Sequence, residues 1–182
     1  DAGGGVLPAM GFIDLIVASY AADGTHRWSG RFGANDATAS AIPNDIGVDA
    51  EGTVTVVGNY FGANDFGGGL LPTPNNDSLF VASYDAQGQH RWSRMLVENS
   101  TFGKLAIDRA GNVYIAGSFS DTQDLGDGPL TSVGMSDVFV LTLTATGAYA
   151  AANPIGGAFS DRMAGIATDA TGYSIAFDVG SD

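Results

Sequence analysis

The chain has 182 residues, the length of one ordinary domain or of a piece of a larger one. Hydrophobic residues make up 45% of it, so we expect a folded core despite the 27 glycines. The net charge of −13 argues against nucleic acid and against an anionic membrane surface as partners, because both repel an acidic protein. The same charge leaves calcium open as a cofactor.

Cysteine is absent, which excludes disulfides, thiolate metal sites and cysteine nucleophiles. No apolar run reaches the roughly 20 residues of a membrane-spanning helix, so we expect no membrane insertion. No signal peptide is visible, since Asp1 leads directly into glycines. We therefore expect an excised or processed piece.

Residues 12–32 predict two strands. The segment DLIVASY (Asp14–Tyr20) is rich in β-branched and aromatic residues, and DGTHRWS (Asp23–Ser29) follows it. Between the two, Asp23-Gly24 marks a tight turn in which glycine supplies a positive φ.

Residues 45–96 predict four strands. The first two flank Glu51-Gly52 within VDAEGTVTVVGNYF (Val48–Phe61). The last two are SLFVASY (Ser78–Tyr84) and QGQHRWS (Gln87–Ser93), which repeat VASY and HRWS at an offset of 64 residues. Matching motifs in the same order at one offset indicate an internal repeat.

Residues 103–153 predict four further strands, and residues 163–177 predict two. The four strands are Gly103–Asp108, Asn112–Phe119, Asp137–Leu143 and Ala148–Asn153. The final pair flanks Thr171-Gly172, where we again expect glycine to supply a positive φ.

The sequence therefore predicts an all-β fold built from about three copies of one repeat of roughly 60 residues. Four hairpin-linked antiparallel strands per repeat are typical of a β-propeller blade. In this phase, residues 1–182 form a single repeat region with a half-blade at 12–32, blades at 45–96 and 103–153, and a half-blade at 163–177. Either the remainder of a longer chain completes the ring, or two copies exchange half-blades as a homodimer with six blades.

The pattern resembles the seven-bladed β-propeller repeat (SBBP) family of bacterial exported proteins. The resemblance rests on D-x-F-V at Asp137–Val140, on Gly-x-x-x-Trp at Gly24–Trp28 and Gly88–Trp92, and on the longer element Asp108–Phe119. It implies a propeller fold and an extracellular or cell-surface location, and it implies no reaction.

The last copy departs from this pattern. Ala151 stands where the other copies have Trp28 and Trp92, and Tyr173–Phe177 matches loosely. We interpret this copy as an eroded or terminal blade.

Two triplets, His26-Arg27-Trp28 and His90-Arg91-Trp92, are the most conspicuous polar-aromatic motifs. One interpretation is a ligand platform, with tryptophan stacking on a sugar and arginine pairing a carboxylate. The favoured interpretation places tryptophan between adjacent blades and arginine on a solvated outer strand. The two histidines lie one blade apart, so a zinc site that they share would need a closer approach and a third ligand, and we do not favour it.

Loops rich in Asp and Asn could hold calcium, but turn formation is the favoured explanation. No D-x-D-x-D-G string occurs. The residues in question are Asn35, Asp36, Asn64, Asp65, Asp121, Asp124 and Asp127.

Asp49, Asp108 and Asp169 each precede a hairpin glycine by three residues. They could act as paired carboxylates in glycoside chemistry, but their place before the hairpin glycine, where they can accept turn N–H bonds, explains them without that role and is favoured. The serines in VASY lack a His-Asp partner, and the triplets Gly3–Gly5 and Gly67–Gly69 open no helix, which favours bend glycines.

We therefore assign no catalytic, cofactor-binding, metal or ligand-binding residue from the sequence. The favoured function is a non-enzymatic binding or scaffold module of an exported or cell-surface bacterial protein, which presents loops on its propeller faces to a protein or glycan. One alternative is a carbohydrate-active enzyme, a glycosidase or lyase, with its site in the central channel. The other is a structural repeat of a surface assembly.

Overall fold

The computed structural model describes residues 1–34, 36–100 and 102–180, and these form strands and turns. The all-β prediction is therefore confirmed. The strands are β1 (Leu15–Tyr20), β2 (His26–Phe32), β3 (Ser40–Val48), β4 (Val54–Phe61), β5 (Ser78–Tyr84), β6 (His90–Glu98), β7 (Gly103–Ile107), β8 (Val113–Phe119), β9 (Thr122–Asp124), β10 (Pro129–Thr131), β11 (Asp137–Leu143), β12 (Tyr149–Ile155), β13 (Asp161–Thr168) and β14 (Tyr173–Val179).

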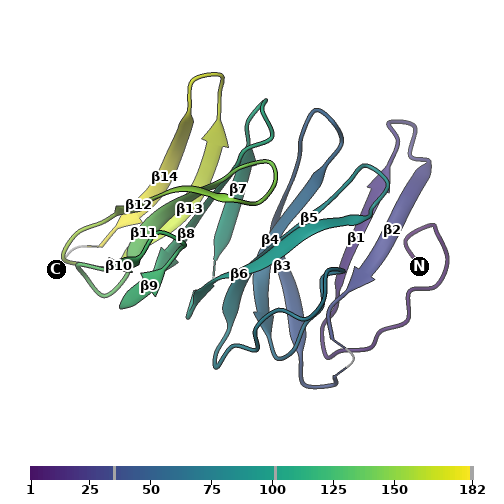
Figure 1. Cartoon of the computed structure of the whole chain (residues 1–182), viewed down its shortest axis with the longest axis horizontal. Helices are drawn as coiled ribbons and strands as arrows, with labels where there is room; N and C mark the ends of the chain where they lie inside the picture. The colour runs from purple at the N-terminus through teal and green to yellow at the C-terminus, as the bar shows by residue number, and fades with distance from the viewer. Residues whose placement is uncertain (35, 101, 181–182) are drawn as a thin grey trace.

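Four antiparallel sheets follow one another along the chain, and we number them in that order. Sheet 1 pairs β1 with β2, sheet 2 has the order β3-β4-β5-β6, sheet 3 has the order β7-β8-β11-β12, and sheet 4 pairs β13 with β14. The short hairpin β9–β10 is inserted between β8 and β11. Figure 1 shows the sheets side by side, with sheet 1 beside the N-terminus and sheet 4 beside the C-terminus.

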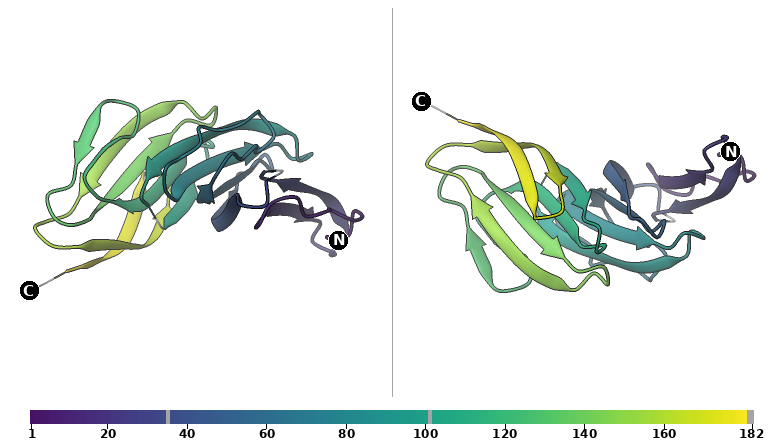
Figure 2. Two further views of the ribbon diagram at one scale, coloured as in Figure 1. Left: turned by 90° about the horizontal axis from the view of Figure 1, so that it is seen from below. Right: turned by 90° about the horizontal axis from the view of Figure 1, so that it is seen from above.

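The row of sheets is open within the described residues. Figure 2 shows the same row from two opposite sides, with the two termini at its opposite ends. Neither a closed barrel nor a closed ring forms in this part of the chain. The propeller architecture and the division into blades therefore stay predictions.

Neighbouring sheets pack face to face because alternate residues of a strand point to opposite faces. On β4, Val56 packs with Leu15 and Val17 of sheet 1, whereas the adjacent Val57 packs with Ile115 and Leu141 of sheet 3. A third apolar cluster joins sheet 3 to sheet 4. Each sheet thus buries its apolar side chains against the next one.

A glycine lies opposite a phenylalanine in both four-stranded sheets. Gly58 of β4 pairs with Phe80 of β5, and Gly117 of β8 pairs with Phe139 of β11. A Cβ on Gly117 would lie only 2.8 Å from the Phe139 ring. The ring therefore fills the space above the glycine, which no larger residue can share.

The turn between β13 and β14 differs from its counterparts. Asp49 donates its backbone N–H to the carbonyl of Thr53, but Asp169 donates to Gly172, which makes the last turn one residue shorter. Gly52 has a φ of +83°, whereas Gly172 is outside the positive-φ region. The prediction of a positive φ at Gly172 is therefore wrong, because the shorter turn does not require it.

Candidate functional site

The tryptophan of each HRW triplet lies between adjacent sheets. Trp28 donates its indole N–H to the carbonyl of Ala86 at 3.0 Å, and Trp92 donates to Ala145 at 3.3 Å. Arg27 is exposed on the outermost strand of its sheet, as is Arg91 on β6. This is the arrangement that the favoured sequence interpretation expected.

The two histidines lie in different sheets and each is covered by a glycine turn. His90 Nε2 lies 3.0 Å from Ser93 Oγ, and the ring packs beneath Gly67 and Gly68. Burial lowers the pKa of His90, and the charge of Asp65 opposes that shift only in part. His90 therefore serves packing, and within the described residues no three His, Asp or Glu side chains gather into a metal site.

The glycine turns belong to a repeated motif, D-x-G-x-G, which contains the glycine triplets that we interpreted from the sequence as bend glycines. Asp65 Oδ1 accepts the N–H groups of Gly67 and Gly69 at 2.7 and 3.0 Å. Asp124 makes the same two bonds with Gly126 and Gly128. Two candidate calcium ligands are thus turn carboxylates, as the favoured explanation had it.

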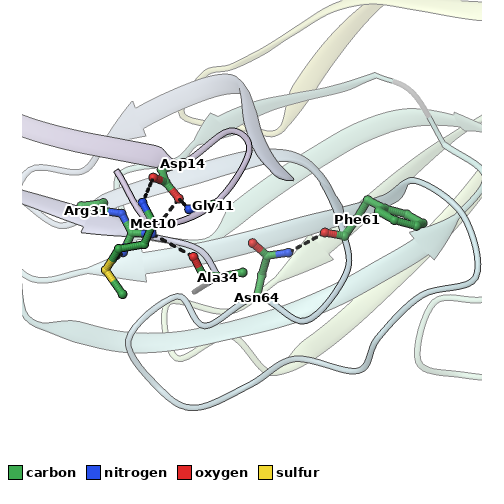
Figure 3. A network of polar contacts seen from close by, with 7 residues as sticks. All are labelled: Met10, Gly11, Asp14, Arg31, Ala34, Phe61 and Asn64. Carbon is green, nitrogen blue, oxygen red and sulfur yellow. Dashed lines mark hydrogen bonds and ion pairs between the residues drawn. The ribbon is translucent and has the colours of Figure 1, made fainter. Parts of the chain in front are cut away.

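The other Asp and Asn candidates are also local. Asp36 Oδ1 accepts the backbone N–H and the hydroxyl of Thr38. Asn64 Nδ2 donates to the carbonyl of Phe61 (Figure 3). Asp121 adopts a positive φ of 59°, and Asp127 lies in the β9–β10 turn. Asn35 lies outside the described residues.

Asp108 and Asp169 line one cavity of about 280 Å³, at the turns of sheets 3 and 4. Burial raises the pKa of Asp108, but hydrogen bonds from Asn112, Ala110 and Tyr114 outweigh it and the net shift is downward. The Thr171 hydroxyl and backbone likewise lower the pKa of Asp169. Both groups cap turns as anions, so neither is poised as the general acid that glycoside hydrolysis needs.

A second cavity, of about 300 Å³, lies between sheet 3 and the start of β13, and we call it the Asp161 cavity. Its lining combines serine hydroxyls, an amide, two aromatic rings and two charged groups. The lining residues are Asn99, Phe102, Ser118, Phe119, Ser120, Ser136, Ser160, Asp161 and Arg162.

Asp161 is 1% exposed, and only one of its oxygens has a partner. Its Oδ2 accepts the Gly157 N–H at 2.9 Å, whereas Oδ1 is buried without a hydrogen bond. Beside it, the guanidinium of Arg162 lies 4.9 Å from the ring centroid of Phe102, which is 48% exposed. The cavity is thus lined by a cationic donor and an accessible aromatic ring, and one oxygen of its lining residue Asp161 is buried without a partner.

Sequence reasoning selected none of these residues. They come from separate segments between positions 99 and 162 and form no motif, so no spacing marks them. The repeat alignment adds no signal, because the offset that relates Asp108 to Asp169 places Phe102 opposite Met163 and not opposite Arg162. Only the packing of sheet 3 on β13 brings them together.

Comparison with protein-family models and with curated proteins finds no match. The resemblance to the seven-bladed repeat family therefore stays a prediction. Among the residues that the structure describes, none forms a helix long and apolar enough to cross a membrane.

Proposed function

We propose that this chain is a non-enzymatic binding module of an exported bacterial protein, built from propeller-like repeats, and that the Asp161 cavity holds a neutral glycan. The observation that carries the proposal is the buried, unpartnered Asp161 Oδ1 in a cavity that also offers Arg162 and Phe102. An orphaned buried acceptor is costly, and a ligand hydroxyl would satisfy it.

The chemistry of the lining matches a saccharide. Phe102 presents an apolar ring on which a pyranose can stack, and Asp161 accepts hydroxyl protons while Arg162 donates to ring or hydroxyl oxygens. Serine hydroxyls do both. A few polar groups around an apolar surface are typical of small-ligand sites.

Charge favours a neutral ligand over an acidic one. The chain carries a net charge of −13, and the cavity lining contains one basic side chain, Arg162, beside the acidic Asp161. Sulfated, sialylated or uronic-acid glycans would therefore approach against the field of the protein.

The repeat geometry supports the propeller part of the proposal. The first strands of consecutive sheets bond to one another: Leu105 donates its N–H to Asp45 Oδ2 at 3.1 Å, and Thr168 Oγ1 donates to the carbonyl of Ile107. Sheet 4 holds the first two strands of a repeat and sheet 1 the last two. Joined by a longer chain or by a second copy, they would complete one more four-stranded sheet.

An enzyme is the weaker proposal. Glycosidase chemistry needs a carboxylic acid with a raised pKa, and every carboxyl group of the described residues with a resolved shift moves downward.

A glycan array tests the binding proposal directly. The wild-type chain should bind neutral glycans and bind acidic ones less, and Phe102→Ala and Arg162→Ala should lose at least about tenfold in affinity. The control is Leu70→Ala, which removes an exposed apolar side chain that does not line the cavity. This variant should bind glycans as the wild type does. An array without neutral-glycan signal, or a signal that Phe102→Ala leaves intact, would overturn the proposal.

A further inference from the structure

Sheet 1 contains a buried ion pair, and the residues at the same two positions can be compared in sheets 2 and 3. Asp14 Oδ1 lies 2.7 Å from the Arg31 guanidinium, and both side chains are largely buried (Figure 3). The other oxygen, Oδ2, accepts the backbone N–H of Met10 at 2.9 Å. Oδ1 also accepts the Gly11 N–H at 3.0 Å, so the carboxylate is held by two backbone donors and neutralised by one cation.

Sheet 3 repeats the anion without the cation. Asp137 lies at the position of Asp14, and its Oδ2 accepts the Val133 N–H at 2.8 Å, the counterpart of the Met10 bond. In sheet 1, Arg31 pairs with Ile16, and in sheet 3 the matching pair is Phe139 with Pro154. Proline therefore takes the place of arginine, and Asp137 Oδ1 is buried without a partner.

Sheet 2 shows that the position does not require a charge. Ser78 stands where Asp14 stands, and Met95, which pairs with Phe80, takes the place of Arg31. The two positions are both charged in sheet 1 and both neutral in sheet 2. Of these three sheets, sheet 3 alone has the acid without the base.

A second orphaned carboxylate adjoins the first. Asp161 donates its backbone N–H to the carbonyl of Ser136, the neighbour of Asp137. Both carboxylates reach the same dipeptide: Asp137 Oδ1 lies 2.6 Å from where a Cβ on Gly156 would stand, and Asp161 Oδ2 accepts the Gly157 N–H. Asp137 is 2% exposed and Asp161 is 1% exposed.

No basic side chain of the described residues neutralises this pair. Among the described residues, the ion pair within 4.0 Å is the one between Asp14 and Arg31. Arg162 directs its guanidinium over the ring of Phe102 instead. Buried charges without counter-ions are strongly unfavourable, so an external cation has a large gain in free energy available here.

We propose that a calcium ion binds at Asp137 and Asp161. Both groups are hard oxygen donors, which calcium prefers, and the nearby Ser136 and Ser160 add hydroxyl and carbonyl oxygens. The Asp161 cavity gives the ion a path from solvent. Calcium takes about six to eight ligands, so ligand hydroxyls can fill the positions that the protein leaves open. The proposal nevertheless stands without the glycan, because the charge imbalance exists in the unliganded chain.

Thermal unfolding and calorimetry of the whole chain with calcium chloride alone test the proposal. Calcium should raise the Tm by about 3–6 °C at ten times its Kd, and magnesium or sodium chloride at equal ionic strength should not. Asp137→Asn and Asp161→Asn should abolish the rise and the calorimetric signal. Asp127→Asn, which removes one exposed negative charge in the β9–β10 turn, should retain both.

Pro154→Arg provides a second test that does not depend on removing a carboxylate. Its guanidinium would supply the missing counter-charge, so this variant should fold without calcium and lose at least about tenfold in calcium affinity. No calcium-dependent rise in the wild type, or a rise that persists in both Asp→Asn variants, would overturn the proposal. A glycan that binds equally with and without a chelator would leave the glycan proposal intact while the calcium proposal fails.

Discussion

Trp92 donates its indole N–H to the carbonyl of Ala145, 3.3 Å away in the turn of the next sheet. Trp28 makes the same bond to Ala86 one sheet earlier, at 3.0 Å. Within the described chain, each bond joins the outermost strand of one sheet to the last hairpin of the following sheet. The sheets are therefore coupled by a repeated bond as well as by apolar packing.

Replacement of Trp92 should separate the two contributions. Trp92→Phe keeps an aromatic ring against Gly147 but loses the donor, and we expect it to lower the free energy of unfolding by about 1 kcal/mol. Trp92→Ala also loses the packing and should cost about 3 kcal/mol. Urea denaturation measures both values. Equal losses in the two variants would show that the ring contributes nothing at this junction.

Gly117 should tolerate no side chain. A Cβ there would lie 2.8 Å from the Phe139 ring and 2.9 Å from the Phe102 carbonyl oxygen, so Gly117→Ala should cost about 1–3 kcal/mol. Gly172→Ala is the matched control, because Gly172 has open space at its Cβ and no positive φ. Denaturation midpoints compare the two. A control as unstable as Gly117→Ala would contradict the packing explanation.

His90 should make stability depend on pH. Burial holds its pKa below the ordinary value of 6.5, so the unfolded chain binds the proton more readily. The contribution of the neutral His90 ring to the free energy of unfolding is fully present above pH 6.5 and is lost as the pH falls below that value. His90→Tyr, which copies Tyr149 of the next repeat, should flatten this part of the profile of unfolding free energy against pH. An unchanged slope between about pH 6.5 and 5 would contradict this role.

One substitution at two equivalent positions should have opposite effects. Both variants are measured with a chelator present, so that calcium does not contribute. Asp14→Ser should then destabilise the chain by about 3–5 kcal/mol, because it leaves Arg31 buried and unpaired. Asp137→Ser copies Ser78 of sheet 2 and removes an anion that has no counter-ion and one unpartnered oxygen, so it should stabilise the chain by about 1–3 kcal/mol. Chemical denaturation of both variants decides, and a loss of stability in Asp137→Ser would contradict the charge argument.

The strands and their repeat could be read from the sequence because both depend on local patterns. VASY and HRWS mark the last two strands of a repeat, and the Trp28 position between sheets follows from its recurrence. The Asp14–Arg31 pair depends on strand register across a hairpin, and only the paired strands reveal that Pro154 replaces the arginine.

Local sequence patterns could not predict the Asp161 cavity. Phe102 and Arg162 meet because β13 packs on sheet 3, and neither residue type announces a ligand site in isolation. The shortened turn at Asp169 was also hidden, since the Asp-to-Gly spacing is the same in all three copies and the missing residue follows the glycine.

The binding role of the Asp161 cavity is most directly tested by ¹H–¹⁵N NMR spectra of the chain titrated with methyl glycosides of glucose, galactose, mannose and N-acetylglucosamine. We expect saturable shifts for at least one glycoside, confined to the amides around Phe102, Ser118–Ser120 and Ser160–Arg162. Absence of shifts with all four sugars, or shifts centred on sheet 1 instead, would contradict the account.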